Sequence, residues 1–422
     1  MPDESTERHI ALPDAELEEA ILHAERLDFE GHEVFVWRPE RDKLFEAVPA
    51  DIDISGVEST MLAREVGPCG GVEAAVAGAK VAAREVRVVL NARLTNGADS
   101  SAELAAAGVE MGLLADEVEP EDGTWYGASA HGNPVELMKA RERGHDVIDF
   151  TCIYVDKTHR EIETVAVDAE ADGVPTGIIY LSIGGKPGHA ELVGSQQLME
   201  HHGVPYVVVF DESEIDSLFA DGGDESLTAL GWERIRIVSQ TTNDSDAAEG
   251  VADLITDRIV EHDLLIDTQT YPYNRDDVCR TVTHRQNATR EMVRRGVENL
   301  IVMGSVNSKN TQSLVKVALA EVEAMFAEGE QPALTNVIYA NSHLQLPAEI
   351  DGHVGIVSGA SSDQRNIDWM VSTIAPIGAV EMVGGTDKGD GPFRLVRRGK
   401  IGRERARQIE ISNQIRGGSD AA

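Results

Sequence analysis

Short apolar runs alternate with longer amphipathic stretches along most of the chain. A short apolar run bounded by turn residues predicts a buried strand, and apolar residues at helical spacing predict a helix. The predicted strands cover residues 86–90, 147–150, 178–183, 204–210, 236–239, 299–303, 336–340 and 353–358. The predicted helices cover residues 98–107, 135–143, 246–258, 312–327 and 364–374. Because strands and helices take turns, the pattern predicts an α/β fold with mostly parallel sheets.

The two ends of the chain differ from this pattern. Residues 1–60 are acidic and contain one predicted helix, at 14–27, and one predicted strand, at 32–37. We interpret them as an appended N-terminal segment that precedes three α/β domains, at 61–150, 151–275 and 276–384. Residues 385–422 are rich in glycine and then in arginine, and we interpret them as a C-terminal tail.

The chain contains three cysteines, and each stands where a helix is expected to begin. They are Cys69, Cys152 and Cys279. The positive end of a helix stabilises a thiolate. Three thiolates from distant segments could therefore converge on one iron–sulfur cluster and leave one iron open for catalysis. The alternative is that these cysteines are ordinary small buried side chains.

Polar loops follow several of the predicted strands. They read Ser-Ala-His-Gly at 129–132, Gly-His-Ala-Glu at 188–191, Gln-Thr-Thr at 240–242, Asn-Ser-Lys-Asn at 307–310 and Gly-Ala-Ser-Ser at 359–362. Ligands of parallel sheets bind at the carboxyl ends of the strands, and hydrogen-bond donors at helix N-termini favour phosphate. One such loop is common in α/β proteins, so their number carries the prediction of a phosphorylated ligand.

The chain has a large excess of acidic residues. The chain has 74 acidic and 37 basic residues, which gives a formal net charge of −37. A surface of this kind argues against nucleic acid and anionic membranes as partners, and it favours a halophilic protein over an acidic mesophilic enzyme. The sequence shows no secretory signal and no apolar run of transmembrane length. Three widely spaced cysteines argue against a disulfide framework, so we expect a reducing, cytoplasmic location.

Taken together, the motifs resemble the IspH/LytB family of 4-hydroxy-3-methylbut-2-enyl diphosphate reductases. The resemblance runs from residue 63 to residue 375, with the motifs in the same order. It rests on VGPCGGV at 66–72, SAHG at 129–132, DFTCIYVDKTH at 149–159, GHAELVG at 188–194, QTT at 240–242, DVCRTVTHRQNA at 277–288, GSVNSKNT at 304–311 and GAS at 359–361.

The resemblance implies three α/β domains around a pseudo-threefold axis, with one cysteine from each domain bound to a central 4Fe-4S cluster. It also implies a two-electron reductive dehydroxylation that releases water and forms isopentenyl and dimethylallyl diphosphate. A ferredoxin or flavodoxin is the electron donor that the resemblance implies.

The resemblance also assigns roles to individual residues. Glu191 would deliver a proton to the leaving hydroxyl, and Thr241 would orient that hydroxyl or relay the proton. Alternatively, Glu191 is one more acidic surface residue, and Thr241 is a helix N-cap. The remaining residues would bind the diphosphate, and they are His131, His189, Ser308, Asn310 and Ser361.

Two departures from the family pattern concern this diphosphate. The family's His-Asn pair aligns with Thr95 and Asn96, and the second serine of its Asn-Ser-Ser-Asn motif is Lys309 here. Since lysine binds phosphate as a point charge, Lys309 could replace the missing histidine. The alternative functions are a related cluster enzyme acting on another allylic or phosphorylated substrate, and a non-catalytic redox sensor.

Overall fold

The computed structural model describes residues 22–29, 31–39, 53–94, 98–121, 123–220, 226–306, 308–340, 346–347, 349–360, 362–374 and 380–384. These residues fall into two compact units, which are described separately below. The first unit holds the described residues up to Pro68 and those from His284 onward. The second unit holds Cys69 to Leu94 and Asp99 to Thr283.

A seven-stranded sheet forms the centre of the first unit, in the order β1-β2-β12-β11-β13-β3-β14. Its strands are β1 (Leu22–Phe29), β2 (His32–Pro39), β3 (Asp53–Ala63), β11 (Asn299–Met303), β12 (Asn336–Ala340), β13 (Glu349–Ser358) and β14 (Val380–Val383). The pair β1–β2 is antiparallel, and the other neighbouring strands are parallel. Its helices are α10 (Arg280–Arg294), which begins at the end of the second unit, α11 (Lys309–Ala327) and α12 (Gln364–Ile374).

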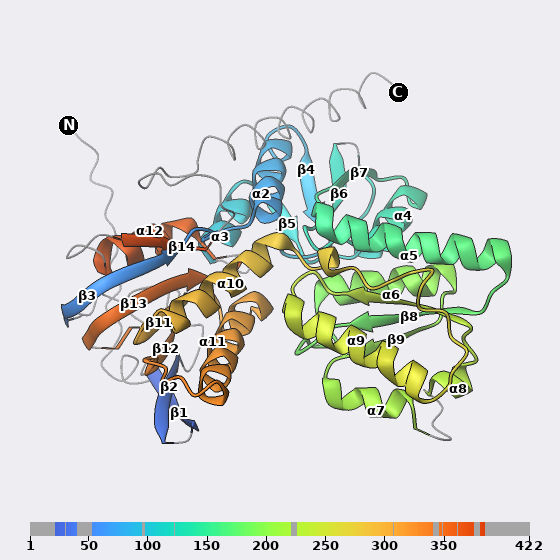
Figure 1. Ribbon diagram of the computed structural model, residues 1–422. Helices are drawn as coiled ribbons and strands as arrows, with labels where there is room; N and C mark the ends of the chain where they lie inside the picture. The colour runs from blue at the N-terminus through green and yellow to red at the C-terminus, as the bar shows by residue number, and fades with distance from the viewer. Residues whose placement is uncertain are drawn as a thin grey trace, which may run out of the picture. The chain divides into compact units, whose positions relative to one another are not determined.

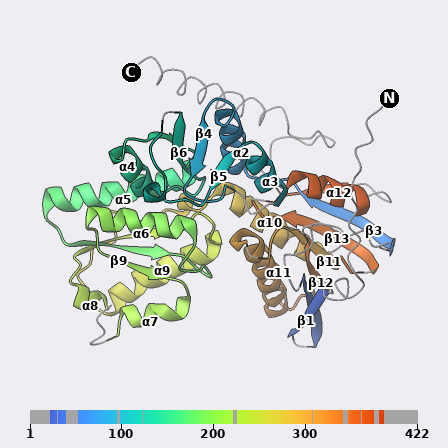
Figure 2. The same ribbon diagram turned by 180° about the vertical axis from the view of Figure 1, so that it is seen from behind.

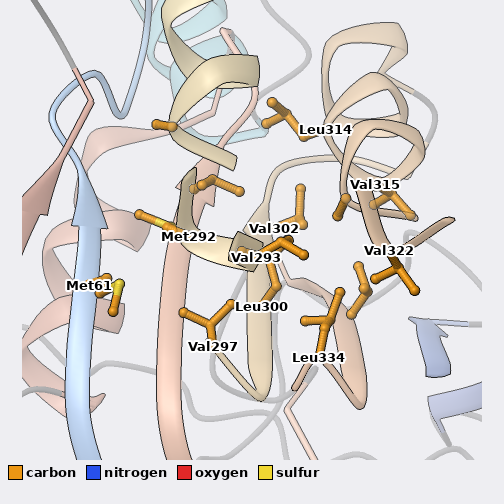
Figure 3. Close-up of a cluster of buried hydrophobic side chains, with 14 of the residues drawn as sticks. Met61, Met292, Val293, Val297, Leu300, Val302, Leu314, Val315, Val322 and Leu334 are labelled. Atoms are coloured by element: carbon orange, nitrogen blue, oxygen red, sulfur yellow. The ribbon is translucent and has the colours of Figure 1, made fainter. Parts of the chain in front are cut away.

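Strand β11 has buried apolar side chains on both faces of this sheet. Leu300 and Val302 belong to a buried cluster with residues of α10 and α11, and Figure 3 shows Val302 near Leu314 and Val293. Ile301 and Met303 belong to a second cluster, with residues of α12. Because successive side chains of a strand point to opposite faces, a strand buried on both faces reads as a continuous apolar run.

The second unit contains two parallel sheets. One has the order β5-β4-β6-β7, from Val109–Met111, Arg87–Leu90, Thr124–Ala128 and Asp146–Asp149. The other has the order β10-β8-β9, from Arg234–Ser239, Thr176–Leu181 and Tyr206–Val209. The longer helices are α2 (Gly70–Ala82), α3 (Ala98–Ala106), α4 (Pro134–Glu142), α5 (Ile153–Asp172), α6 (Ala190–His202) and α9 (Ser245–Glu261), and the short ones are α7 (Ile215–Leu218) and α8 (Leu227–Leu230).

The three-stranded sheet of the second unit has helices on both faces (Figures 1 and 2). Ile178 and Tyr180 of β8 pack into a core cluster with α5 and α6, whereas Ile179 and Leu181 pack into another with α9. Each strand of this sheet is followed by a polar loop at its carboxyl end, and the loop after β10 contains Thr241. The sheet thus brings candidate site residues to one edge.

The predicted α/β class with mostly parallel sheets is confirmed. The helix predicted at 14–27 is wrong over Leu22–Leu27, which belong to strand β1. Gly31, with φ of +92°, lets the chain reverse, so that β1 can pair with β2 along its whole length. This pairing overrides the local helical pattern.

Strands β2 and β3 also join the described part of segment 1–60 to the sheet of residues 299–383. The predicted domain boundaries and the pseudo-threefold arrangement stay predictions, and the predicted tail at 385–422 lies outside the described residues. Within the described ranges, no helix is long and apolar enough to cross a membrane.

Candidate active site

All three cysteines stand at helix starts, as the sequence predicts. Cys69 is the N-cap of α2, Cys152 is the N-cap of α5, and Cys279 directly precedes α10. Cys69 and Cys152 have extended backbone conformations, and neither side chain makes a capping hydrogen bond. The backbone N–H of Tyr154, at the start of α5, lies close enough to the Cys152 thiol to lower its pKa, which burial raises.

The three thiols lie together in the second unit. A Cβ atom placed on Gly71 would lie 2.8 Å from Sγ of Cys152 and 3.8 Å from Sγ of Cys69. The pKa of Cys152 is raised to about 12, mainly by burial and to a smaller extent by the nearby Cys69, Cys279 and Glu191. Burial also raises the pKa of Cys279 to about 11, with a further contribution from Cys69. Three partly or fully buried free thiols thus share one space.

These thiols fit an iron–sulfur cluster better than a single metal ion. Among the described residues, no three His, Cys, Asp or Glu side chains are spaced to hold one ion. In a cluster each thiolate binds a different iron, so its sulfurs stand farther apart than the ligands of one ion do. A cationic metal group also favours the thiolate form, which burial alone disfavours here.

Glu191 and Thr241 form a buried pair. Glu191 lies in the first turn of α6 and is fully buried. Its carboxylate accepts hydrogen bonds from the backbone N–H of Thr241, at 2.6 Å, and from the Thr241 hydroxyl, at 2.9 Å. The backbone oxygen of Thr241 in turn accepts from the N–H of Cys279 at 2.9 Å. A direct chain of bonds therefore connects the carboxylate to one of the three cysteines.

This geometry excludes the two alternative interpretations of Glu191 and Thr241, as a surface acid and as a helix N-cap. Glu191 is not an acidic surface residue, because its exposed fraction is 0%. Thr241 is not the N-cap of the helix that follows it, because Asp244 caps α9 through the N–H groups of Asp246 and Ala247. The buried carboxylate and hydroxyl instead bond to each other.

His131 and His189 also meet in the second unit. Their rings stand edge to face with centroids 5.2 Å apart. Nδ1 of His189 accepts from the N–H of Glu191 at 3.3 Å and lies 2.8 Å from Nε2 of Gln240. This leaves Nε2 of His189 as the donor of the neutral ring. Burial lowers the pKa of His131, which favours the neutral form of that ring.

Gln240 is a positioning residue that sequence reasoning missed. Its side chain is fully buried and lies between the Ser182 hydroxyl, which donates to Oε1 at 2.6 Å, and His189. The Gln-Thr-Thr motif contained the signal, but it did not say which way the amide points.

The remaining predicted site residues belong to the first unit or lie outside the described residues. Ser308, Lys309 and Asn310 stand together at the N-terminus of α11, directly after β11. Oδ1 of Asn310 has no hydrogen-bond partner among the described residues. Helix N-terminal N–H groups and these side chains form a surface suited to an anion. Thr95, Asn96 and Ser361 lie outside the described residues.

The chain is similar to a known family of proteins along most of its length. The family described as "LytB protein" matches residues 60–375. A 4-hydroxy-3-methylbut-2-enyl diphosphate reductase of Tolumonas auensis is 26% identical over 326 residues, which cover 76% of this chain and 93% of the relative. The reductase of Leifsonia xyli is 27% identical over 336 residues, which cover 79% and 88%.

A solved structure gives the same result for the fold. The structure of the E-1-hydroxy-2-methyl-but-2-enyl-4-diphosphate reductase from Plasmodium falciparum matches with a TM-score of 0.58 and 17% sequence identity. The match covers 83% of this chain and 99% of that chain. Likeness at this identity shows a shared fold.

Proposed function

The chain belongs to the LytB protein family, and on that premise we propose that it is a 4-hydroxy-3-methylbut-2-enyl diphosphate reductase. In the proposed reaction, two electrons and two protons convert the allylic alcohol into isopentenyl or dimethylallyl diphosphate and one water. The observation that carries the proposal is a fully buried carboxylate, Glu191, bonded to Thr241 beside three thiols.

Cys69, Cys152 and Cys279 would hold a 4Fe-4S cluster. When bound, this group supplies the electrons and an open iron for the substrate hydroxyl. The chain contributes the three thiolates, and it shields them in part from water, since Cys279 is buried and Cys69 and Cys152 are partly buried. Burial keeps water away from the reacting groups and strengthens electrostatic interactions with them.

Glu191 is suited to deliver the proton that leaves with the hydroxyl as water. A positioned carboxylic acid in a buried site is a common proton donor, and such groups contribute about 10²–10⁴-fold to rates. The two bonds from Thr241 fix the orientation of the carboxylate. In the proposed reaction Thr241 orients the hydroxyl, and its own hydroxyl passes the proton from Glu191.

His131 and His189 would bind the diphosphate as donors or cations, and the side chains of Asn96, Ser308, Asn310 and Ser361 would add further donors. Thr95 stands where the family has a histidine, so one donor or cation is missing from this set. We propose that Lys309 supplies the missing positive charge. Lys309 is the first residue of α11, where the helix N-terminus also favours an anion.

Partners and location follow from the same proposal. A ferredoxin or flavodoxin would supply electrons one at a time, and the enzyme would act in a reducing cytoplasm. The net charge of −37 supports adaptation to concentrated salt and gives no reason to propose nucleic acid or an anionic membrane as a partner.

The test is anaerobic turnover of 4-hydroxy-3-methylbut-2-enyl diphosphate in molar KCl, with protein whose visible absorbance confirms a cluster. Formation of both five-carbon diphosphates supports the proposal. A loaded cluster without turnover refutes it and favours the alternative of another allylic or phosphorylated substrate, which the Thr95 and Lys309 departures suggest. A redox sensor is distinguished by Glu191→Gln, because a sensor has no turnover to lose.

A further inference from the structure

Four charged side chains form a cluster inside the second unit, and we call Lys157, Glu161, Arg236 and Asp277 the ion cluster. Oδ1 of Asp277 accepts from Nζ of Lys157 at 2.9 Å, and its Oδ2 accepts from Nη2 of Arg236 at 3.0 Å. Nη2 of Arg236 also donates to Glu161 at 2.6 Å. Both oxygens of Asp277 are thus bonded to a cation.

The burial of the ion cluster calls for an explanation. The side chain of Asp277 is 1% exposed and that of Arg236 is 6% exposed. Burying charges is costly, and an ion pair of this kind is weak evidence for stability. In some proteins such groups instead fix one specific arrangement of the chain.

Each member of the ion cluster lies on a segment that leads to the candidate active site. Lys157 and Glu161 lie on α5, whose N-cap is Cys152. Arg236 lies on β10, which ends one residue before Gln240 and so leads directly to Thr241. Asp277 lies in the short 3-10 helix η3 (Arg275–Asp277), two residues before Cys279.

Further bonds tie the same segments together. Nη1 of Arg236 donates to the backbone oxygen of Pro272, on the approach to η3. The N–H of Cys279 donates to the oxygen of Thr241 at 2.9 Å. The loop that presents Cys279 is therefore held from two sides, by the ion cluster and by Thr241.

We infer that Asp277 and Arg236 are positioning residues, which set the place of Cys279 relative to Cys152 and Thr241. The inference rests on the proposed function where it concerns turnover, but its first test does not. A cysteine loop that loses its anchor should open more often in the apoprotein. A displacement of about 1 Å in a reacting group can lower a rate about 10²-fold.

The experiment compares wild-type protein with Asp277→Asn, which keeps the shape and removes the charge. Lys157→Met is the milder second variant, because the Lys157 side chain is 36% exposed. Glu321→Gln is the matched control, since Glu321 is a buried acid paired with Arg294 in the first unit. Three quantities are measured: the alkylation rate of each cysteine in apoprotein, by peptide mass spectrometry; the loss of the reconstituted cluster to a chelator; and kcat and KM.

For Asp277→Asn we expect alkylation of Cys279 to rise about tenfold or more, because breaking a buried ion pair favours local opening. Alkylation of Cys69 should change little. Cluster loss should become faster, and kcat should fall about 10²-fold with KM nearly constant. Lys157→Met should change the same quantities in the same direction by a smaller factor, and Glu321→Gln should change none of them.

The outcomes separate the inference from the proposed function. If Asp277→Asn and Lys157→Met leave Cys279 alkylation and cluster loss at wild-type values, the inference is overturned, whatever the turnover. If all three cysteines become equally reactive, the ion cluster only stabilises the unit, and the inference is also overturned. A selective rise at Cys279 supports the inference even when wild-type protein does not turn over the proposed substrate.

Discussion

Gly71 tests whether two of the three thiols, those of Cys69 and Cys152, lie close together. A Cβ atom on Gly71 would lie 2.8 Å from Sγ and 3.2 Å from Cβ of Cys152. Non-bonded heavy atoms have their best separation at about 3.5–4.0 Å. Gly71→Ala therefore forces Sγ of Cys152 to move by about 0.7 Å or more, or to rotate into another rotamer. Metal–ligand distances tolerate only about 0.2 Å, so the cluster should bind less well.

The neighbouring Gly70 provides the matched control. A Cβ atom on Gly70 would have no neighbour within 4 Å. Both glycines begin α2, so alanine should raise helix stability by up to about 1 kcal/mol at either position. Overpacking costs about 1–3 kcal/mol at Gly71 alone. We therefore expect Gly70→Ala to unfold at or above the wild-type temperature, with a normal cluster.

The assay is anaerobic reconstitution followed by iron and sulfide analysis, visible absorbance and the rate of cluster release to a chelator. The overpacking at Gly71 should destabilise the protein with its cluster bound. A cost of about 1–3 kcal/mol corresponds to a factor of about 5 to 150, so Gly71→Ala should release its cluster faster than Gly70→Ala by about this factor. Equal iron content and equal release rates in the two variants would refute the reasoning, because the thiols then do not meet at Gly71.

Three further predictions concern the proton, the diphosphate and pH. Glu191→Gln should lower kcat at least 10²-fold and leave the cluster absorbance unchanged; retained turnover would exclude Glu191 as the proton donor. Lys309→Ala should raise KM about tenfold or more, whereas the exposed Lys316→Ala on the same helix should not, and equal values would remove Lys309 from the site. Burial lowers the pKa of His159 to about 4, so the unfolded state binds more protons between about pH 6.5 and 4, and stability falls as pH falls. The free energy of unfolding, measured with urea, should fall by about 2 kcal/mol between pH 7 and pH 5 through this group. His159→Gln should reduce this fall, whereas a change at the exposed His201, His201→Gln, should not. An equal fall in both variants would contradict the prediction.

The regular elements could be predicted because their patterns are local. An apolar run such as 299–303 is buried on both faces, and β11 has these same bounds. The positions of the cysteines at helix starts could also be predicted from sequence, because the start of a helix depends on the residues next to it. The helix at 14–27 failed over Leu22–Leu27 for the opposite reason, because β1 depends on its pairing with β2.

The candidate site could be predicted by residue type but not by contact. The motifs named Glu191 and Thr241 as a donor and an orienting group, but only the structure joins them through two hydrogen bonds. The carboxylate could equally have been a surface acid in a chain with 74 acidic residues. Burial, which decides between the two readings, depends on tertiary packing that a single sequence does not display.

The ion cluster shows why contact rather than composition has to carry a functional argument. In so acidic a chain, Glu161 is not distinguishable by sequence from dozens of other carboxylates, and the motif that begins at Asp277 does not say whether that carboxylate is buried. Exposed pairs such as Arg160–Asp156, with side chains 73% and 40% exposed, are screened by salt and contribute little. Asp277 and Arg236 are removed from solvent, so concentrated salt screens them much less. A strongly acidic chain can therefore contain a few buried charges that salt screens much less than the exposed ones. The inference predicts that Asp277→Asn remains defective at all KCl concentrations that support wild-type turnover; recovery of the variant at higher salt would show that the charge acts through a screened, long-range field and not through position.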